Sequence, residues 1–261
     1  MDRLNPAVLP AEFRREHADA GQLESSSASL QQERMPFTVR IVADDNGLEK
    51  AVQMRRLAYS RHLPDFAEKM AIERSDREPG TIVLLAESKL DGGPLGTMRI
   101  QTNEFAPLAL EQSVTLPDWL RGTRLAEATR LGVAGGTIGR MVKIALCKAL
   151  FMYCGQEQID WMVITARSPL DREYEAMLFV DVFGKEEFLP MAHVGGLHHR
   201  VMAKPVAVAR QRWAEVRHPL YRFVFQTSHP DIDLNPMHLS LEPETVRCPR
   251  DSEIAQPIRT R

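Results

Sequence analysis

The sequence contains few cysteines, and their spacing excludes the common cysteine-based sites. Only Cys147, Cys154 and Cys248 occur among 261 residues, and no two of them have C-x-x-C spacing. An odd number of cysteines without a disulfide or zinc pattern is typical of free thiols in a reducing compartment. We therefore expect three thiols and a cytoplasmic protein.

A strong excess of one charge is also absent. The chain has 33 basic and 35 acidic side chains, so its formal net charge is only -2. Proteins that bind nucleic acids usually present a broad positive surface. The composition therefore predicts no nucleic-acid partner, and any other charged partner has to be met by a local patch.

Long apolar runs are missing too. The most apolar helix candidate, residues 141–154, is interrupted by Lys143 and Lys148, and the N-terminus has no signal-peptide pattern. We expect no transmembrane segment and leave peripheral contact with a membrane open. The hydrophobic content of 44% is sufficient for a core in a chain of this length.

Composition divides the chain into three parts. Residues 1–34 are polar and rich in Ser, Gln and Glu, which predicts a flexible tail. Residues 35–242 carry strand and helix patterns and predict one domain that ends in a helical extension. Residues 243–261 are polar again and are expected to be a frayed tail.

Hydrophobic periodicity predicts the elements of that domain. Strands are expected at 37–43, 81–88, 95–101, 124–134, 159–166, 187–194 and 197–206. The turn signal at 91–94 joins two of them into a hairpin. Helices are expected at 48–63, 137–154, 168–184 with Ser168 as N-cap, and 206–225. This order predicts an α/β (α+β) fold.

Glu127 and Arg130 are conspicuous because they lie in an apolar segment that runs into glycines. Residues three apart point to opposite faces of a regular strand, so these two share a face only if a bulge intervenes. A helix would bring them together, but the glycines between 132 and 139 disfavour one. We expect a strand, a glycine turn and then a helix. The alternative to a functional role is a buried ion pair between the two charges.

The glycine turn would allow a ligand to approach the backbone. Free N–H groups at a bulge or at a helix start bind phosphates, pantetheine amides or a developing oxyanion. Two basic residues at the start of the helix, Arg140 and Lys143, would suit an acidic partner. A solvated helix face is the alternative for both.

Four further motifs connect the sequence to a known family: Arg55-x-x-x-Tyr59, Glu73-x-x-Asp76, Gly96-x-x-Arg99 and Glu127-x-x-Arg130. Over roughly residues 36 to 205, their order and spacing resemble the GNAT acyltransferase superfamily. The similarity is greatest to the branch of acyl-homoserine-lactone synthases and FeeM-type long-chain N-acyl amino acid synthases. The GGTIGR segment looks like a degenerate form of the GNAT pyrophosphate loop.

The resemblance implies a GNAT-like fold with a mixed, strongly twisted central sheet flanked by helices and an extra C-terminal helix. It also implies a reaction in which the α-amine of an amino acid takes a long-chain fatty acyl group from the thioester of an acyl carrier protein. The donor is then acyl-phosphopantetheine, with CoA as the less favoured carrier. No bound cofactor and no metal are implied, and His193, His198 and His199 lack the spacing of a metal site.

The resemblance also implies roles for residues. Glu127 would be the base, directly or through a water, and Arg130 would orient it or bind the acceptor carboxylate. The backbone of Leu131, Gly132 and Val133 would hold the oxyanion. The carrier and its phosphopantetheine would contact the helix start, namely Gly135, Gly136, Thr137, Gly139, Arg140 and Lys143.

The remaining motif residues have two readings. Arg55, Tyr59, Glu73, Asp76 and Arg99 would bind substrate, with one arginine gripping the acceptor carboxylate. Alternatively, the two arginines pair with the two acidic residues and lock that connection against the sheet. The sequence leaves both open.

Three other functions stay open. A CoA-dependent GNAT N-acetyltransferase is disfavoured by the degenerate loop. An acyl-homoserine-lactone synthase is disfavoured because that family typically has a tryptophan shortly after the aromatic residue of the first helix, and here no tryptophan occurs before Trp119. Residues 227–232, TSHPDI, also look more like the FeeM group. A non-catalytic acyl-carrier or lipid-binding module is the third. The general acid stays unassigned. In many GNAT enzymes a tyrosine in the helix after the strand expected here at 159–166 protonates the leaving thiol, but in this sequence Phe179 occupies the corresponding position and Tyr174 lies at least one helical turn away.

Overall fold

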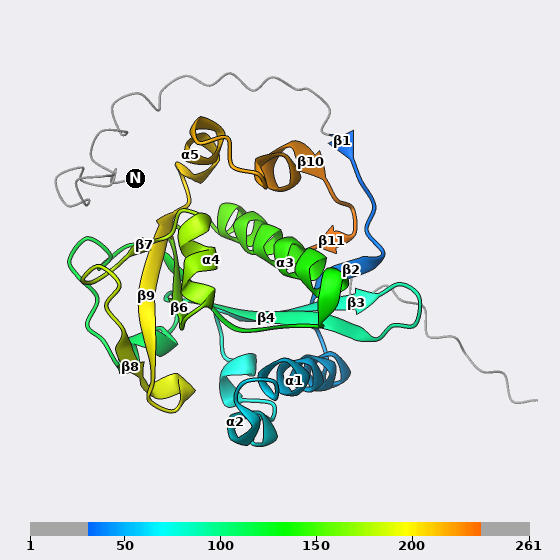
Figure 1. The fold of residues 1–261 in the computed structure, drawn as a ribbon, viewed down its shortest axis with the longest axis horizontal. Helices are drawn as coiled ribbons and strands as arrows, with labels where there is room; N and C mark the ends of the chain where they lie inside the picture. The colour runs from blue at the N-terminus through cyan, green and yellow to red at the C-terminus, as the bar shows by residue number, and fades with distance from the viewer. Residues whose placement is uncertain (1–30, 236–261) are drawn as a thin grey trace, which may run out of the picture.

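The computed structural model describes residues 31–235. Segments 1–30 and 243–261 of the expected tails, and Cys248, lie outside the described residues. Residues 31–34, the end of the expected N-terminal tail, contribute to the fold because β1 (Gln31–Gln32) pairs in parallel with β10 (Thr227–Ser228). The first described strand therefore lies beside a strand close to the end of the described residues (Figure 1).

A mixed sheet of nine strands forms the centre of the molecule, in the order β11-β2-β3-β4-β5-β6-β9-β7 with β8 beside β9. The strands are β2 (Phe37–Ile41), β3 (Thr81–Ser88), β4 (Pro94–Thr102), β5 (Leu125–Val133), β6 (Trp161–Ala166), β7 (Val180–Asp181), β8 (Leu189–Met191), β9 (Leu197–Pro205) and β11 (Ile232–Asp233). The expected hairpin is confirmed, since β3 and β4 are antiparallel neighbours. Within this nine-stranded sheet of the described residues, only the pairs β11/β2 and β5/β6 are parallel.

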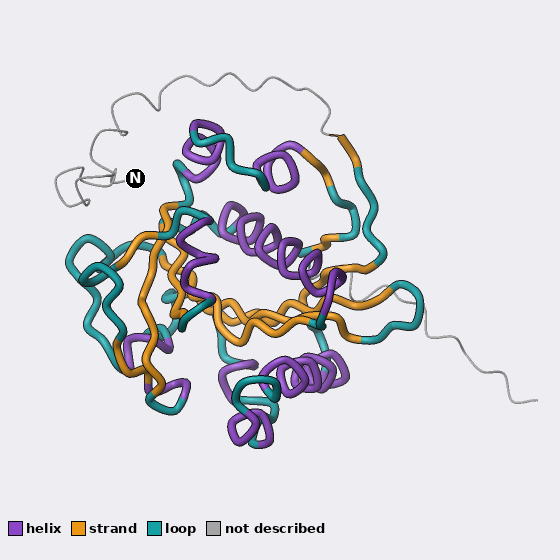
Figure 2. Tube along the Cα trace, in the orientation of Figure 1, coloured by secondary structure: helices purple, strands orange, loops and turns teal. Residues whose placement is uncertain are grey.

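Helices cover both faces of the sheet. Helices α1 (Asp45–Tyr59) and α2 (Pro64–Glu68) lie on one face, and α3 (Gly136–Gln156) and α4 (Leu170–Ala176) lie on the other (Figures 1 and 2). Beyond α3 lies α5 (Ala209–Glu215), followed by a short π-helix, η4 (Arg222–Gln226). Short 3-10 helices occupy three connections: η1 (Arg74–Arg77), η2 (Ala109–Gln112) and η3 (Ala192–Val194).

The uninterrupted apolar run of β3 follows from this layering. Val83 and Leu85 pack with α1 residues on one face, while Leu84 and Ala86 join the main core under α3 on the other. A strand buried on both faces needs no polar alternation. Helix α1 begins at Asp45 rather than at 48 and ends at Tyr59 rather than at 63. It begins early because Asp44 acts as its N-cap, with its side chain accepting the Gly47 N–H at 2.8 Å.

Several expected elements are wrong in extent. Helix α4 ends at Ala176 rather than near 184, because Val180 and Asp181 pair with β9 as strand β7. Its N-cap is Pro169, not Ser168. The expected helix over 206–225 is divided into α5 and η4, with Pro219 between them. The strand expected over 187–194 is confined to β8, and η3 follows it.

Strands β5 and β6 separate part of the way along their length. They pair from Leu125 and Trp161 to Ala128 and Ile164. Beyond this point β5 continues beside β4, and β6 continues beside β9. The sheet therefore opens between the carboxyl ends of two parallel strands, where ligand sites of open sheets commonly lie.

Candidate active site

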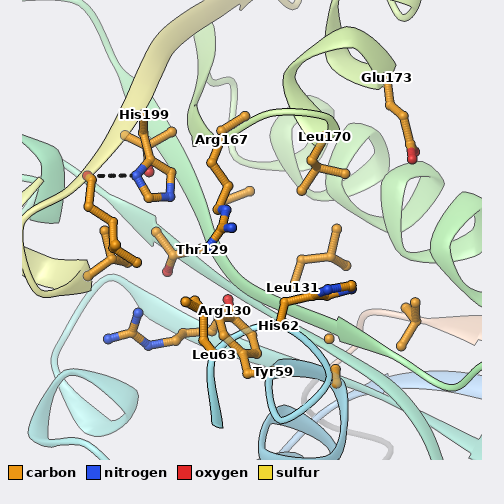
Figure 3. A pocket seen from close by; sticks show the side chains of 18 of the residues that line it. Tyr59, His62, Leu63, Thr129, Arg130, Leu131, Arg167, Leu170, Glu173 and His199 are labelled. Carbon is orange, nitrogen blue, oxygen red and sulfur yellow. Dashed lines mark hydrogen bonds between the residues drawn. The ribbon is translucent and has the colours of Figure 1, made fainter. Parts of the chain in front are cut away.

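A pocket of about 430 Å³ occupies the opening between β5 and β6. Its walls come from five segments: the end of α1 with the start of α2, residues 128–133 of β5, Lys143 of α3, residues 165–174 at and after the end of β6, and residues 193–199 around the start of β9. Figure 3 shows side chains from these segments converging on one space. Residues far apart in the sequence thus share a site because the sheet opens here.

Strand β5 bulges where it borders the pocket. Thr129 is paired with Arg99 and Gly132 with Thr97, so Arg130 and Leu131 together oppose the single residue Met98. Arg130 has a φ of 54°, a left-handed conformation that is uncommon for a side chain of this size. The bulge required for Glu127 and Arg130 to share a face is therefore present.

Arg130 pairs with Glu73 and not with Glu127. Its Nη2 atom lies 2.6 Å from Oε1 of Glu73, and its Nε atom lies 3.0 Å from Oε2. Burial opposes ionisation of Glu73, but the hydrogen bonds and charges of Arg130 and Arg99 hold its pKa below the ordinary value. The ion pair between Glu127 and Arg130, the structural alternative from sequence, is not formed.

The other motif residues form one charge network around η1. Nη1 and Nη2 of Arg55 each lie 2.8 Å from an oxygen of Asp76. Arg99 donates to Glu73 at 2.5 Å, to Ser75 at 2.6 Å and to Asp76 at 3.4 Å. These contacts fix η1 against the sheet, which is the locking role that the sequence left open.

Glu127 lies behind the pocket rather than in its wall. The side chain is 0% exposed; Oε2 accepts the Leu110 N–H at 3.2 Å, and Oε1 has no hydrogen-bond partner among the described residues. Burial raises the pKa of Glu127 to about 7. Thr129, two positions further along the same face of β5, does line the pocket. Any proton transfer to Glu127 therefore has to cross an intervening group.

His193 lines the pocket and was not assigned a role from the sequence. Its Nε2 atom lies 3.2 Å from the hydroxyl of Thr165, while its Nδ1 atom is buried without a partner among the described residues. Burial and the charge of Arg130 lower the pKa of His193 to about 4, so the imidazole is neutral at neutral pH.

The start of α3 lies beside the pocket but does not line it. Of the residues expected to contact the carrier, Lys143 is in the pocket wall, whereas Gly135, Gly136, Thr137, Gly139 and Arg140 are not. Gly136 has a φ of 73°, and a Cβ on Gly139 would lie 1.8 Å from the carbonyl oxygen of Ala134. Only glycine permits this turn without rearrangement. A Cβ on Gly135 would lie 3.4 Å from Nη2 of Arg61, so that arginine lies beside the helix start and also lines the pocket.

The two basic residues of α3 that the sequence singled out make local contacts. Arg140 donates to the Thr137 hydroxyl at 3.0 Å on the exposed surface. Lys143 lines the pocket and pairs with Glu173 of α4. Tyr174 also lines the pocket, and burial raises its pKa, so it is neutral at neutral pH.

Sequence reasoning missed Arg61, Arg167, Tyr174, His193 and His199 as pocket residues. Arg167 carries a usable signal, because it directly follows a buried parallel strand at the carboxyl edge of the sheet. His193 and His199 carry no such sequence signal, because η3 and β9 come close to β5 only in the tertiary fold.

The comparisons with known proteins agree with this geometry. A sequence profile of the family described as N-acyl amino acid synthase FeeM matches residues 50–196. Comparison with curated protein sequences gives no significant match. Among solved structures, FeeM from uncultured soil microbes is 16% identical, with a TM-score of 0.54 over 69% of this chain and 96% of FeeM.

Two further structures are similar at lower scores. The CoA-dependent acyl-homoserine lactone synthase BjaI is 14% identical, with a TM-score of 0.49 over 74% of this chain and 93% of BjaI. Aminoglycoside 6'-acetyltransferase type Ii is 17% identical, with a TM-score of 0.44 over 64% of this chain and 96% of its own. Separately, no helix within residues 31–235 is both long and apolar enough to cross a membrane.

Proposed function

The chain belongs to the FeeM family of N-acyl amino acid synthases and is an N-acyltransferase with a GNAT-like fold, and we propose that it transfers a fatty acyl group from an acyl carrier protein to the α-amine of an amino acid. One observation carries the proposal: a pocket in the opening between β5 and β6 extends from Arg61 and Val133, beside the glycine-rich start of α3, to a polar wall formed by residues of η3 and β9. A thioester and an amine can meet in such a passage from opposite ends.

The donor arm would enter at the start of α3. Gly135 and Gly136 leave the backbone open there, and Arg61 lies beside them with no side-chain partner among the described residues. A helix N-terminus and an arginine together favour a phosphate such as that of phosphopantetheine. Arg140, exposed one turn into the helix, would add attraction for an acidic carrier protein.

The thioester carbonyl would lie against the bulged part of β5. Because β6 no longer pairs with this strand beyond Ala128, the backbone of Leu131 to Val133 borders the pocket. An N–H group there would stabilise the oxyanion that forms on the carbonyl oxygen. Apolar pocket residues would hold the acyl chain, among them Leu63, Phe66, Leu131, Leu170 and Val194.

In the proposed reaction, the amine nitrogen attacks the thioester carbon, and the carbon–sulfur bond then breaks to release the carrier thiol. The ammonium form of the acceptor cannot attack, so a base has to take a proton. Glu127, with a pKa of about 7, is better matched to that task than His193, with a pKa of about 4. Since Glu127 does not line the pocket, it would act through a water.

The leaving thiolate also needs a proton. Tyr174 lines the pocket on the α4 side, close to the Lys143–Glu173 pair. Its hydroxyl is neutral at neutral pH because burial raises its pKa. We assign it the role of proton donor to the carrier thiol, which the sequence left unassigned.

Mass spectrometry of one reaction tests the proposal. Purified protein is mixed with long-chain acyl carrier protein and an equimolar pool of the twenty amino acids, and a parallel reaction contains acyl-CoA of the same chain length. The expected result is an N-acyl amino acid formed faster from the carrier protein. A clear preference for CoA would contradict the carrier, and no amide from either donor would favour a non-catalytic acyl-binding module.

A further inference from the structure

Resting on the proposed function, the geometry points to Arg167 as the residue that binds the α-carboxylate of the acceptor amino acid. The bond would be an ion pair with bidentate hydrogen bonds, the geometry that a guanidinium offers a carboxylate. Arg167 would then decide that the enzyme acylates amino acids rather than amines without a carboxylate.

Arg167 is placed to contact a ligand. It follows Ala166, the last residue of β6, so the rigid sheet fixes its backbone at the rim of the opening. Its side chain is half-buried and lines the pocket. Figure 3 shows the guanidinium pointing into the pocket, on the side of Thr129 and His199.

The guanidinium of Arg167 is unoccupied by the protein. Within residues 31–235 it forms no hydrogen bond and no ion pair, whereas Arg55, Arg99 and Arg130 are each engaged with Glu73 or Asp76. Those three arginines were the sequence-based candidates for the carboxylate. Their partners leave Arg167 as the arginine on this side of the pocket that is available to an anion.

The surroundings leave the charge of Arg167 unbalanced. Among residues 31–235, Glu173 is the only acidic residue in the pocket wall, and it is paired with Lys143. The neighbouring His199 is held with Nδ1 2.9 Å from the Leu197 carbonyl, and burial together with the charge of Arg167 lowers its pKa. A half-buried cation facing a neutral imidazole favours an anionic ligand.

The position of Arg167 also suits the reaction. Arg61 and the start of α3 mark the donor end, while Arg167 lies toward His199 at the other end. An amino acid held there by its carboxylate carries its amine one carbon away. The amine can then face the bulged segment of β5, across the pocket from Arg167, where the thioester is proposed to lie.

A competition between two acceptors in one tube tests this role. The protein receives long-chain acyl carrier protein, an equimolar pool of the twenty amino acids and an equal pool of their α-amides, and the two classes of product are counted by mass spectrometry. Arg167→Gln is expected to lower the ratio of N-acyl amino acids to N-acyl amino amides by about 30-fold or more. Because the ratio is internal, partial loss of folded protein does not change it.

Arg61→Gln is the matched control, since this arginine also lines the pocket without a side-chain partner but lies at the donor end. It is expected to raise the KM for the carrier thioester and to leave the product ratio unchanged. An unchanged ratio in Arg167→Gln, or an equal fall in both variants, would overturn the assignment.

Failure of the proposed function gives a different result. If the wild-type protein forms no amide with either pool, equilibrium dialysis against the labelled amino-acid pool still tests the subsite. Binding that is retained by Arg61→Gln and lost in Arg167→Gln supports the carboxylate site without the reaction. No binding to the wild-type protein overturns both the site and the function.

Discussion

Arg55 and Asp76 face each other with two parallel hydrogen bonds of 2.8 Å, and their side chains are 1% and 0% exposed. The pair joins α1 to η1 beneath the sheet. Removing one member leaves the other charge buried without its partner, which is far more costly than losing a surface contact. The stability lost when this pair is broken therefore shows how strongly η1, which begins directly after Glu73, is held against α1.

We predict that Asp76→Asn lowers the free energy of unfolding by about 3 to 5 kcal/mol. Urea unfolding monitored by circular dichroism measures the change. Arg74→Ala is the control on the same helix, because its pair with Glu78 is exposed and is worth less than about 1 kcal/mol. Equal effects from both variants would mean that the buried pair is not a stabilising contact.

Glu127→Gln is expected to change the pH dependence of stability. The folded-state pKa of about 7 lies above the ordinary 4.5, so the native state binds this proton more tightly than the unfolded state. Stability of the wild-type protein therefore falls between about pH 4.5 and pH 7, by roughly 3 kcal/mol, and stays low above it. Glutamine cannot ionise, so the variant should lack this fall. Parallel pH profiles for the two proteins would disprove the raised pKa.

The same substitution tests the base. In the wild-type protein, kcat/KM should rise with pH through an apparent pKa near 7, and Glu127→Gln should lower kcat by about 10²-fold or more and remove that rise. His193→Gln is the comparison, because His193 lines the pocket, unlike Glu127, but its pKa of about 4 is poorly matched to the task. A larger loss of kcat in His193→Gln than in Glu127→Gln would transfer the role of base to His193.

Replacing glycine with alanine is expected to have opposite effects on stability at two positions of α3. Gly139→Ala would place a Cβ 1.8 Å from the Ala134 carbonyl oxygen, so it should destabilise the protein and raise the KM for the acyl donor. Gly155→Ala meets nothing within 4 Å and should stabilise the helix by up to about 1 kcal/mol. Thermal unfolding and donor kinetics of both variants check the prediction, which fails if Gly139→Ala behaves like Gly155→Ala.

The sequence predicted those helices and strands whose hydrophobic pattern follows only from packing of the sheet against its helices. Strands β3 and β4 and helices α1 and α3 are each covered on one or both sides along their whole length, so hydrophobic spacing identified them. Helix α4 was overestimated because residues 180–181 form strand β7 with β9, a contact between distant segments. Helical periodicity in a single sequence does not reveal such a competitor.

The charged residues show the same limit. Reasoning on strand geometry gave a bulge only as the condition for Glu127 and Arg130 to share a face, and the structure contains that bulge at Arg130. It did not give the partner of Arg130, since Glu73 is 57 positions away and reaches it only through the path of α2 and η1. For Arg167 the sequence gives its place after a buried strand, but not that the other candidate arginines are already paired, which only the tertiary fold shows.

The bulge in β5 contains one residue more than the sheet requires. Deleting Arg130 would leave Leu131 alone opposite Met98, while Gly132 would still pair with Thr97, so the strand beyond it would keep its orientation. Deleting a residue of β5 outside the bulge would instead turn the following side chains to the wrong face. Arg130 is thus an insertion in the strand: deleting it would remove the partner of Glu73 and preserve the pairing of β5 with β4.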